Sequence, residues 1–150
     1  MNLNKIHISA LLQNKKNSVY FVTIRSTVEE AVAEMNSRRI GSLMVTNSGY
    51  PVGIFTERDV LTRVVAAELN PKSTLISEVM TTELRAIPID ASIEDAMQIM
   101  KEHRIRHLPV FDGDRLLNVL SIIDINSWLL KANEIEAETL RRYVFEAYPC

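Results

Sequence analysis

Apolar residues recur along this chain with helical spacing, and the same pattern returns 65 residues later. The first set, at positions i, i+3, i+4 and i+7 of one helical face, is Val28, Ala31, Val32 and Met35. The second set is Ile93, Ala96, Met97 and Met100. Spacing of this kind predicts an amphipathic helix in each segment. A duplication specifies architecture more firmly than local propensity, so we expect two similar units with two related sites about a pseudo-twofold axis.

Strands are predicted on both sides of each helix. Short runs rich in β-branched, aromatic and aliphatic side chains lie at residues 19–24, 43–46, 52–55, 108–111 and 116–120. The Asn47-Ser48-Gly49 and Asp112-Gly113-Asp114 segments predict hairpin turns between neighbouring strands. Each copy is therefore predicted to have the order β-α-β-β-α, with its last helix at about 56–69 in copy one and from near Ser121 in copy two.

The pattern divides the chain into two repeats, a linker and a tail. The predicted boundaries are 8–69 for repeat one, 70–74 for the linker, 75–130 for repeat two and 131–150 for the helical tail. Short helical lead-ins are expected at 7–12 and 75–80. A small mixed sheet with both helices on one side cannot cover its other face alone. We therefore predict an α/β (α+β) fold of two repeats that pack sheet to sheet.

Composition narrows the function classes. Hydrophobic residues make up 47% and charged residues 24% of the 150 residues, as in soluble globular domains. A formal net charge of -2 gives no electrostatic reason to bind nucleic acid or an acidic membrane. The one cysteine is Cys150, so a disulfide within the chain is excluded. No segment has the pattern of a membrane span or a secretory signal, and a cytoplasmic location is expected.

The tail carries an apolar stripe for which two interpretations remain open. The stripe is Leu140, Val144 and Ala147, with Tyr143 beside it. One interpretation is packing against its own domain, and the other is a contact in a homodimer.

The segment with the strongest candidate chemistry joins a strand to the second helix of each copy. Copy one has Gly53, Thr56 and Asp59, and copy two has Asn118, Ser121 and Asp124 at the same spacing. A structural interpretation is that the hydroxyl caps the helix and the aspartate completes a capping box. A functional interpretation is that a helix N-terminus attracts a phosphate, while the carboxylate accepts from the hydroxyls of a ribose. In the latter, Gly53 lets a ligand approach the backbone.

These features resemble the tandem CBS domain, or Bateman module. The resemblance rests on the G-h-h-T-x-x-D pattern at 53–59, on the RIGSLMV and RIRHLPV segments, and on the duplication itself. It covers about residues 8–130. The whole chain, tail included, is similar to bacterial stand-alone two-CBS proteins, in which FTERDV and IRHLPV recur.

The resemblance implies a non-enzymatic regulatory module that senses an adenosyl ligand in the cleft between repeats and acts on a separate, unknown effector protein. The implied ligands are AMP, ADP or ATP, and in some members S-adenosylmethionine or NAD, with no obligatory cofactor. By motif, Asp59 and Asp124 would hold ribose hydroxyls, and Thr56 and Ser121 would meet the phosphate or the ribose. The adenine would contact Val22, Thr23, Ile87 and Pro88. Candidates for phosphate charge are Arg58, Arg106 and His107. A homodimer through helix faces is also expected.

Copy two departs from the family pattern. Asn118 replaces the glycine, and Ile122-Ile123 replace Glu-Arg, so its motif contains no basic residue. Arg106 and His107 instead stand where copy one has Gly41 and Ser42. The motif alone therefore predicts that copy two is the weaker site for a phosphorylated ligand.

Three other functions compete with this interpretation. The first is a constitutive dimerisation or interaction module without a physiological nucleotide, in which the motif residues are only helix caps. The second is a small nucleotide-hydrolysing enzyme, which is disfavoured because no nucleophile–base set is recognisable. The third is metal binding by His103 and His107, which is disfavoured because the repeat alignment puts one at a helix end and the other at a strand start.

Overall fold

The structure is a computed structural model that describes residues 2–16 and 19–147, with side chains described as far as residue 139. The chain forms two compact units. Unit 1 consists of residues 1–16, 88–108 and 120–150, and unit 2 consists of 17–87 and 109–119. Unit 2 therefore holds the first repeat, whereas unit 1 holds the helices of the second repeat together with the N-terminal segment.

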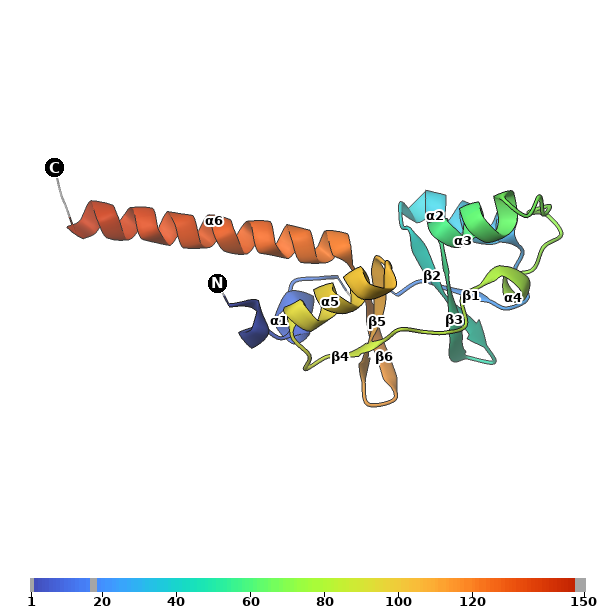
Figure 1. Ribbon diagram of the computed structural model, residues 1–150, viewed down its shortest axis with the longest axis horizontal. Coiled ribbons are helices and arrows are strands. Elements are labelled where there is room, and N and C mark those ends of the chain that lie inside the picture. The colour runs from blue at the N-terminus through green and yellow to red at the C-terminus, as the bar shows by residue number, and fades with distance from the viewer. Residues whose placement is uncertain (1, 17–18, 148–150) are drawn as a thin grey trace. The chain divides into compact units, whose positions relative to one another are not determined.

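The order of elements confirms the predicted duplication (Figure 1). In chain order they are η1 (Leu3–Lys5), α1 (Ile8–Leu12), β1 (Phe21–Thr23), α2 (Val28–Arg38), β2 (Ser42–Asn47), β3 (Tyr50–Thr56), α3 (Glu57–Asp59), η2 (Val60–Val65), α4 (Ile76–Val79), β4 (Ile87–Pro88), α5 (Ile93–His103), β5 (His107–Asp112), β6 (Arg115–Ser121) and α6 (Ile122–Ala147). The strands form two three-stranded sheets, β1-β2-β3 and β4-β5-β6. The predicted mixed α/β class and the β-α-β-β-α order are thus confirmed.

Unit 2 is organised around the first sheet. β1 runs parallel to β2, and β2 pairs antiparallel with β3 with Leu43 opposite Phe55. Buried residues from this sheet and from the surrounding helices form one core, which comprises Val28, Ala31, Met35, Leu43, Val45, Phe55, Val64, Ile76 and Val79. The core includes the three buried residues of α2, so the predicted apolar face is the face that packs inward.

The first long helix of each repeat begins and ends in the same way. Thr27 and Ser92 cap α2 and α5, and Glu30 and Asp95 complete a capping box at the start of each helix. The hydrogen bonds from Ser92 lower the pKa of Asp95. At the other end, Arg39 and Arg104 both adopt the left-handed conformation, with φ of 54° and 52°. The two copies therefore end their first long helix with an arginine in the same backbone conformation.

The two lead-in helices dock in matching ways, but each on the helix of the other repeat. The backbone N–H of Ile76 in α4 donates to the carbonyl of Ser26 at 2.8 Å, at the start of the first repeat. The N–H of Ile8 in α1 donates to the carbonyl of Ala91 at 2.9 Å, at the equivalent place in the second repeat. Both isoleucines are fully buried. Each repeat is therefore completed by the lead-in that precedes the other repeat.

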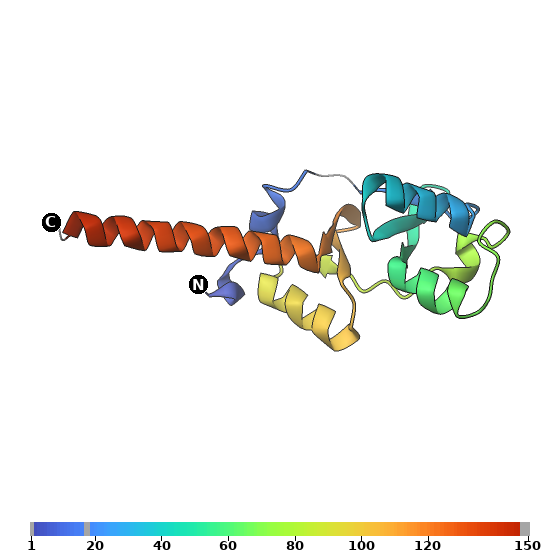
Figure 2. The same ribbon diagram turned by 90° about the horizontal axis from the view of Figure 1, so that it is seen from above.

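The second helices of the two repeats differ in form. In copy one, α3 passes into the π-helical turn η2. In copy two, the helix and the predicted tail form one 26-residue helix, α6, which Figure 2 shows unbroken. The side chains of the tail stripe (Leu140, Tyr143, Val144 and Ala147) lie outside the described residues. No helix in the described part of the chain is long and apolar enough to cross a membrane.

Candidate functional site

In copy one, the motif residues form a capping box at the start of α3. The Thr56 N–H donates to Oδ2 of Asp59 at 2.9 Å, and the Thr56 hydroxyl donates to the same oxygen at 3.2 Å. The Asp59 N–H returns a bond to Thr56 Oγ1 at 3.4 Å. The structural interpretation of this motif is therefore correct as far as capping is concerned.

The second oxygen of Asp59 is engaged from elsewhere in unit 2. The Thr81 hydroxyl donates to Asp59 Oδ1 at 3.0 Å, and Arg63 Nε lies 3.4 Å from the same atom. Arg63 also donates from Nη1 to the carbonyl of Met80 at 2.9 Å. The Asp59 side chain is only 7% exposed. Its carboxylate thus ties the start of α3 to the segment that follows α4.

The glycine of the motif also serves this packing. A Cβ on Gly53 would lie 2.8 Å from the Thr81 carbonyl oxygen and 2.9 Å from Met80 Sδ. The neighbouring Ile54 exchanges backbone hydrogen bonds of 2.9 Å with Thr81 in both directions. The segment that approaches this glycine closely is therefore the chain's own.

In copy two, the same capping box begins α6. The Ser121 N–H and hydroxyl donate to Asp124 Oδ2 at 2.7 and 2.8 Å, and the Asp124 N–H donates to Ser121 Oγ at 3.1 Å. The further partner is Lys15, whose Nζ lies 2.7 Å from Asp124 Oδ2. Both side chains of this ion pair are 24% exposed. Asp124 is therefore more accessible than Asp59 and is paired with a cation from the segment after α1.

Competing effects set the pKa of Asp124. Burial raises it, but the hydrogen bond and charge of Lys15, together with the bonds from Ser121, outweigh burial and hold the pKa below its ordinary value. The group is thus favoured in its charged form, which is the form that accepts hydrogen bonds most strongly.

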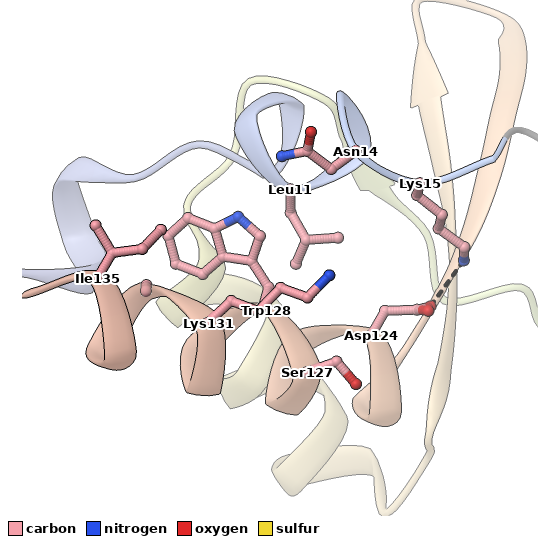
Figure 3. Close-up of a pocket in the computed structure, with 9 residues that line it drawn as sticks. Leu11, Asn14, Lys15, Asp124, Ser127, Trp128, Lys131 and Ile135 are labelled. Carbon is pink, nitrogen blue, oxygen red and sulfur yellow. Dashed lines mark hydrogen bonds and ion pairs between the residues drawn. The ribbon is translucent and has the colours of Figure 1, made fainter. Parts of the chain in front are cut away.

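A pocket of about 600 Å³ opens beside Asp124 in unit 1 (Figure 3). Its lining comes from α1, the segment after it, and α6, and comprises Leu11, Asn14, Lys15, Asp124, Ser127, Trp128, Lys131, Ala132 and Ile135. Figure 3 shows the Trp128 indole between Leu11 and Ile135, with Asp124 and Lys15 paired at the other end. One wall is therefore apolar and aromatic, and the opposite end is charged.

The other predicted ligand residues of unit 1 differ in their exposure and in their link to the start of α6. The Arg106 carbonyl accepts from the N–H of Ile122 at 3.0 Å, which brings its backbone to the residue after Ser121. The Arg106 side chain is exposed, and His107, at the start of β5, is partly buried. Pro88 is exposed in β4. The structure therefore brings Ser121, Asp124 and the Arg106 backbone together.

The predicted ligand residues of unit 2 are divided between surface and core. Val22 is partly buried and Thr23 is exposed, both in β1. Arg58 is exposed in α3, one residue from Asp59. Ile87 is 3% exposed, so its side chain belongs to the core.

Several residues around Asp124 escaped sequence reasoning. Lys15 lies in the connection after a lead-in helix, and Trp128 and Lys131 lie in the first half of α6, beyond the family motif. One signal was present: the lead-ins align with an offset of 68, which puts Asn14 and Lys15 where copy two has Thr82 and Glu83, directly after Thr81. The copies therefore differ in charge in the segment that approaches each motif aspartate.

Other charged groups have structural roles or lie apart. Arg38 pairs with Glu34, and its guanidinium carbon lies 4.1 Å from the Tyr20 ring centroid. His103 ends α5 and His107 begins β5, as the repeat alignment predicts. In the described part of the chain, no three His, Cys, Asp or Glu side chains gather in a way that could hold a metal ion.

Comparisons with known proteins agree on one family. The profile of the CBS domain matches residues 15–66 and again 76–131. The chain is 32% identical over 118 residues to the CBS domain-containing protein YhcV of Bacillus subtilis, an alignment that covers 79% of this chain and 84% of that protein.

Solved structures show the same architecture. A signal-transduction protein with CBS domains from Burkholderia ambifaria has 34% identity and a TM-score of 0.81, covering 83% of this chain and 94% of that one. The CBS domain protein PAE2072 from Pyrobaculum aerophilum, complexed with AMP, has 28% identity and a TM-score of 0.69, covering 79% and 89%.

Proposed function

This chain belongs to the CBS-domain family, and we propose that it is a regulatory module that binds an adenosyl ligand and passes the binding signal to a separate protein. AMP, ADP and ATP are the favoured ligands, with S-adenosylmethionine and NAD as further members of the class. Support for this class of ligand comes from the AMP complex of the Pyrobaculum aerophilum relative. The ligand-binding residues of this chain are proposed from the surroundings of Asp124.

The observation that carries the proposal is the environment of Asp124. Its carboxylate is one-quarter exposed, has a lowered pKa and stands at the start of a long helix beside a pocket. A charged carboxylate can accept from both hydroxyls of a ribose, and such bonds contribute about 1.5–3 kcal/mol each. Ser121, Arg106 and His107 are the proposed neighbours for the phosphate, aided by the positive end of the α6 dipole.

Copy one is proposed as the secondary site. Thr56, Arg58 and Asp59 match the family motif, but Asp59 is buried and already bonded by Thr81 and Arg63. A ligand would have to compete with these internal partners. We therefore favour copy two as the principal site, which is the reverse of the order that the motif alone predicts, because Lys15 supplies the cation that the motif of copy two lacks.

Thermal shift with a panel of ligands tests the proposal. A ligand at about 100 times its dissociation constant stabilises the fold by roughly 2.7 kcal/mol. For a chain of this length, that corresponds to a rise on the order of 5–10 °C in melting temperature. We expect such a rise for at least one adenine nucleotide and a smaller one for GTP. No rise with any adenosyl compound would favour the competing function, an interaction module without a nucleotide.

We also propose that the protein is a homodimer through the faces of its second helices. Exposed apolar side chains lie on these helices in both repeats, with Leu61 64% and Val65 62% exposed in η2, and Ile123 72% and Leu130 66% exposed in α6. Clustered exposed apolar side chains are typical of interaction surfaces. Sedimentation at tens of micromolar should give twice 17.0 kDa, and a monomer would contradict the dimer.

A further inference from the structure

The pocket of unit 1 combines an aromatic wall with charged and polar groups, a combination that suits a ligand with both a ring and a charged group. Trp128 supplies a planar aromatic wall, and Lys15 and Lys131 supply two cations against the single carboxylate of Asp124. Asn14 and Ser127 add an amide and a hydroxyl. Volumes of about 300–1,000 Å³ are typical of pockets that enclose small organic ligands, and this pocket, at about 600 Å³, falls inside that range.

We propose that this pocket binds a nucleoside phosphate, with Trp128 stacked on the base and with Lys15 and Lys131 adding two cations to the proposed phosphate neighbours Ser121, Arg106 and His107. The inference deepens the proposed function and rests on it, because the ribose would lie at Asp124. It adds three binding residues that the family motif does not contain, two of them on α6 beyond the capping box.

Charge balance explains how the ligand enters. In the structure, Lys15 is held by Asp124 at 2.7 Å, and both groups are three-quarters buried. A ligand that separates this pair must offer each group a new partner, because both are partly shielded from water. A nucleoside phosphate provides a new partner for both groups, since its ribose hydroxyls donate to Asp124 and its phosphate accepts from Lys15. A neutral nucleoside offers Lys15 nothing in exchange, so the pocket should discriminate strongly in favour of phosphorylated ligands.

The ring wall supplies the second part of the selectivity. Stacking of a nucleic-acid base on an aromatic side chain contributes about 1–3 kcal/mol. Leu11 and Ile135 extend the apolar surface on either side of the indole (Figure 3). A sugar phosphate without a base would meet the cations but leave this wall uncovered, so it should bind more weakly than the nucleotide.

Trp128 gives a direct readout, because it is the only tryptophan in the chain. We would titrate the full-length protein with AMP, adenosine, ribose 5-phosphate and inorganic phosphate, and follow indole emission and calorimetric heat in parallel. AMP should change the emission saturably, with the same dissociation constant as the heat. Adenosine and ribose 5-phosphate should each bind at least about tenfold more weakly, since each lacks one of the two anchors.

Matched variants locate the site. Lys131→Met should weaken AMP about three- to tenfold, whereas Lys101→Met, which removes an exposed lysine from α5 outside the pocket, should change nothing. Trp128→Leu should weaken AMP by about five- to a hundredfold by calorimetry. Trp128→Phe should restore part of that loss, because a phenyl ring still stacks.

The outcomes separate this inference from the proposed function. If AMP binds by calorimetry but leaves the Trp128 emission and the Lys131→Met affinity unchanged, the ligand lies elsewhere and this pocket assignment is overturned while nucleotide sensing stands. If no adenosyl compound gives saturable heat, nucleotide sensing itself fails, and the pocket assignment fails with it.

Discussion

The two motif aspartates start from the same sequence pattern and reach different environments. Asp59 is 7% exposed and bridges Thr56, Thr81 and Arg63, whereas Asp124 is 24% exposed and is held by Ser121 and Lys15 beside a pocket. Both complete a capping box, so the box does not distinguish them. The motif therefore specifies how the helix begins. Residues outside the motif that contact the aspartate decide whether its carboxylate is bonded within the protein interior or is accessible to a ligand.

The outside residues come from equivalent places. The segment after α4 brings Thr81 to Asp59, and the segment after α1 brings Lys15 to Asp124. In copy one this segment also packs over Gly53 and closes the site. A change in a short connection, rather than in the motif, is thus enough to give two copies of one fold different roles.

The largest loss of stability should come from changes in the lead-in helices, which dock in the same way in both copies. Ile8→Ala and Ile76→Ala each remove a fully buried side chain that docks a lead-in helix, so each should lower the free energy of unfolding by about 2–5 kcal/mol. The exposed neighbour Ser77→Ala, in α4, is the control and should change it little. Urea denaturation measures all three. A large loss at one isoleucine and none at the other would break the equivalence of the two docking sites.

The next effect tests the closure of copy one. Gly53→Ala places a methyl group 2.8 Å from a backbone carbonyl, and overpacking of this kind typically costs about 1–3 kcal/mol. The free energy of unfolding should fall by that amount, with AMP affinity changed less than about threefold at a temperature where the variant is folded. If Gly53→Ala instead abolishes AMP binding without loss of stability, the glycine faces a ligand and copy one is the principal site.

An effect of similar size at Asp59, with a smaller one at Asp124, separates the two aspartates by stability. Asp59→Asn removes a buried charge that accepts from Thr81 and faces Arg63, so the free energy of unfolding should fall by about 1.5–3 kcal/mol. Asp124→Asn breaks a partly exposed ion pair, for which about 0–1 kcal/mol is expected. Melting temperatures of the two variants without ligand decide the matter. Equal losses of melting temperature would mean that both carboxylates contribute equally to stability, which would contradict the difference in their surroundings.

The smallest effect is a dependence on acid. The folded-state pKa of Asp124 is lowered, so its contribution to stability is present above the unfolded value of about 4 and disappears as the pH falls through the folded value. The difference in melting temperature between wild type and Asp124→Asn should therefore shrink below about pH 4. Asp95 also has a lowered pKa, but it is common to both proteins and cancels in the difference. A difference that grows in acid would contradict the assignment.

The features that sequence predicted are those with local signatures. Helical spacing, hydroxyl caps and turn residues act within a few positions, so the order of elements and the capping boxes of α3 and α6 follow from the chain alone. Strand ends differ by one or two residues, as for β1, which is shorter than the predicted 19–24. The matched Val28 and Ile93 are buried, as the repeat requires.

The features that sequence could not predict depend on contacts between distant residues. Lys15 and Asp124 are 109 positions apart, and no periodicity links a lysine in a connection to an aspartate in a helix cap. The docking of each lead-in on the helix of the other repeat is likewise invisible in local pattern. The helix α6 continues across the predicted boundary between repeat two and the tail, because residues on both sides of residue 130 keep helical structure without a break.

Isothermal titration of AMP into wild type, Asp59→Asn and Asp124→Asn tests the central claim, that the same motif aspartate is internal in copy one and ligand-facing in copy two. Asp124→Asn should weaken AMP by at least about tenfold while the protein stays folded, because the hydrogen bonds to a charged acceptor are lost. Asp59→Asn should bind AMP within about threefold of wild type despite its lower melting temperature. Loss of binding in Asp59→Asn with normal binding in Asp124→Asn would contradict the account.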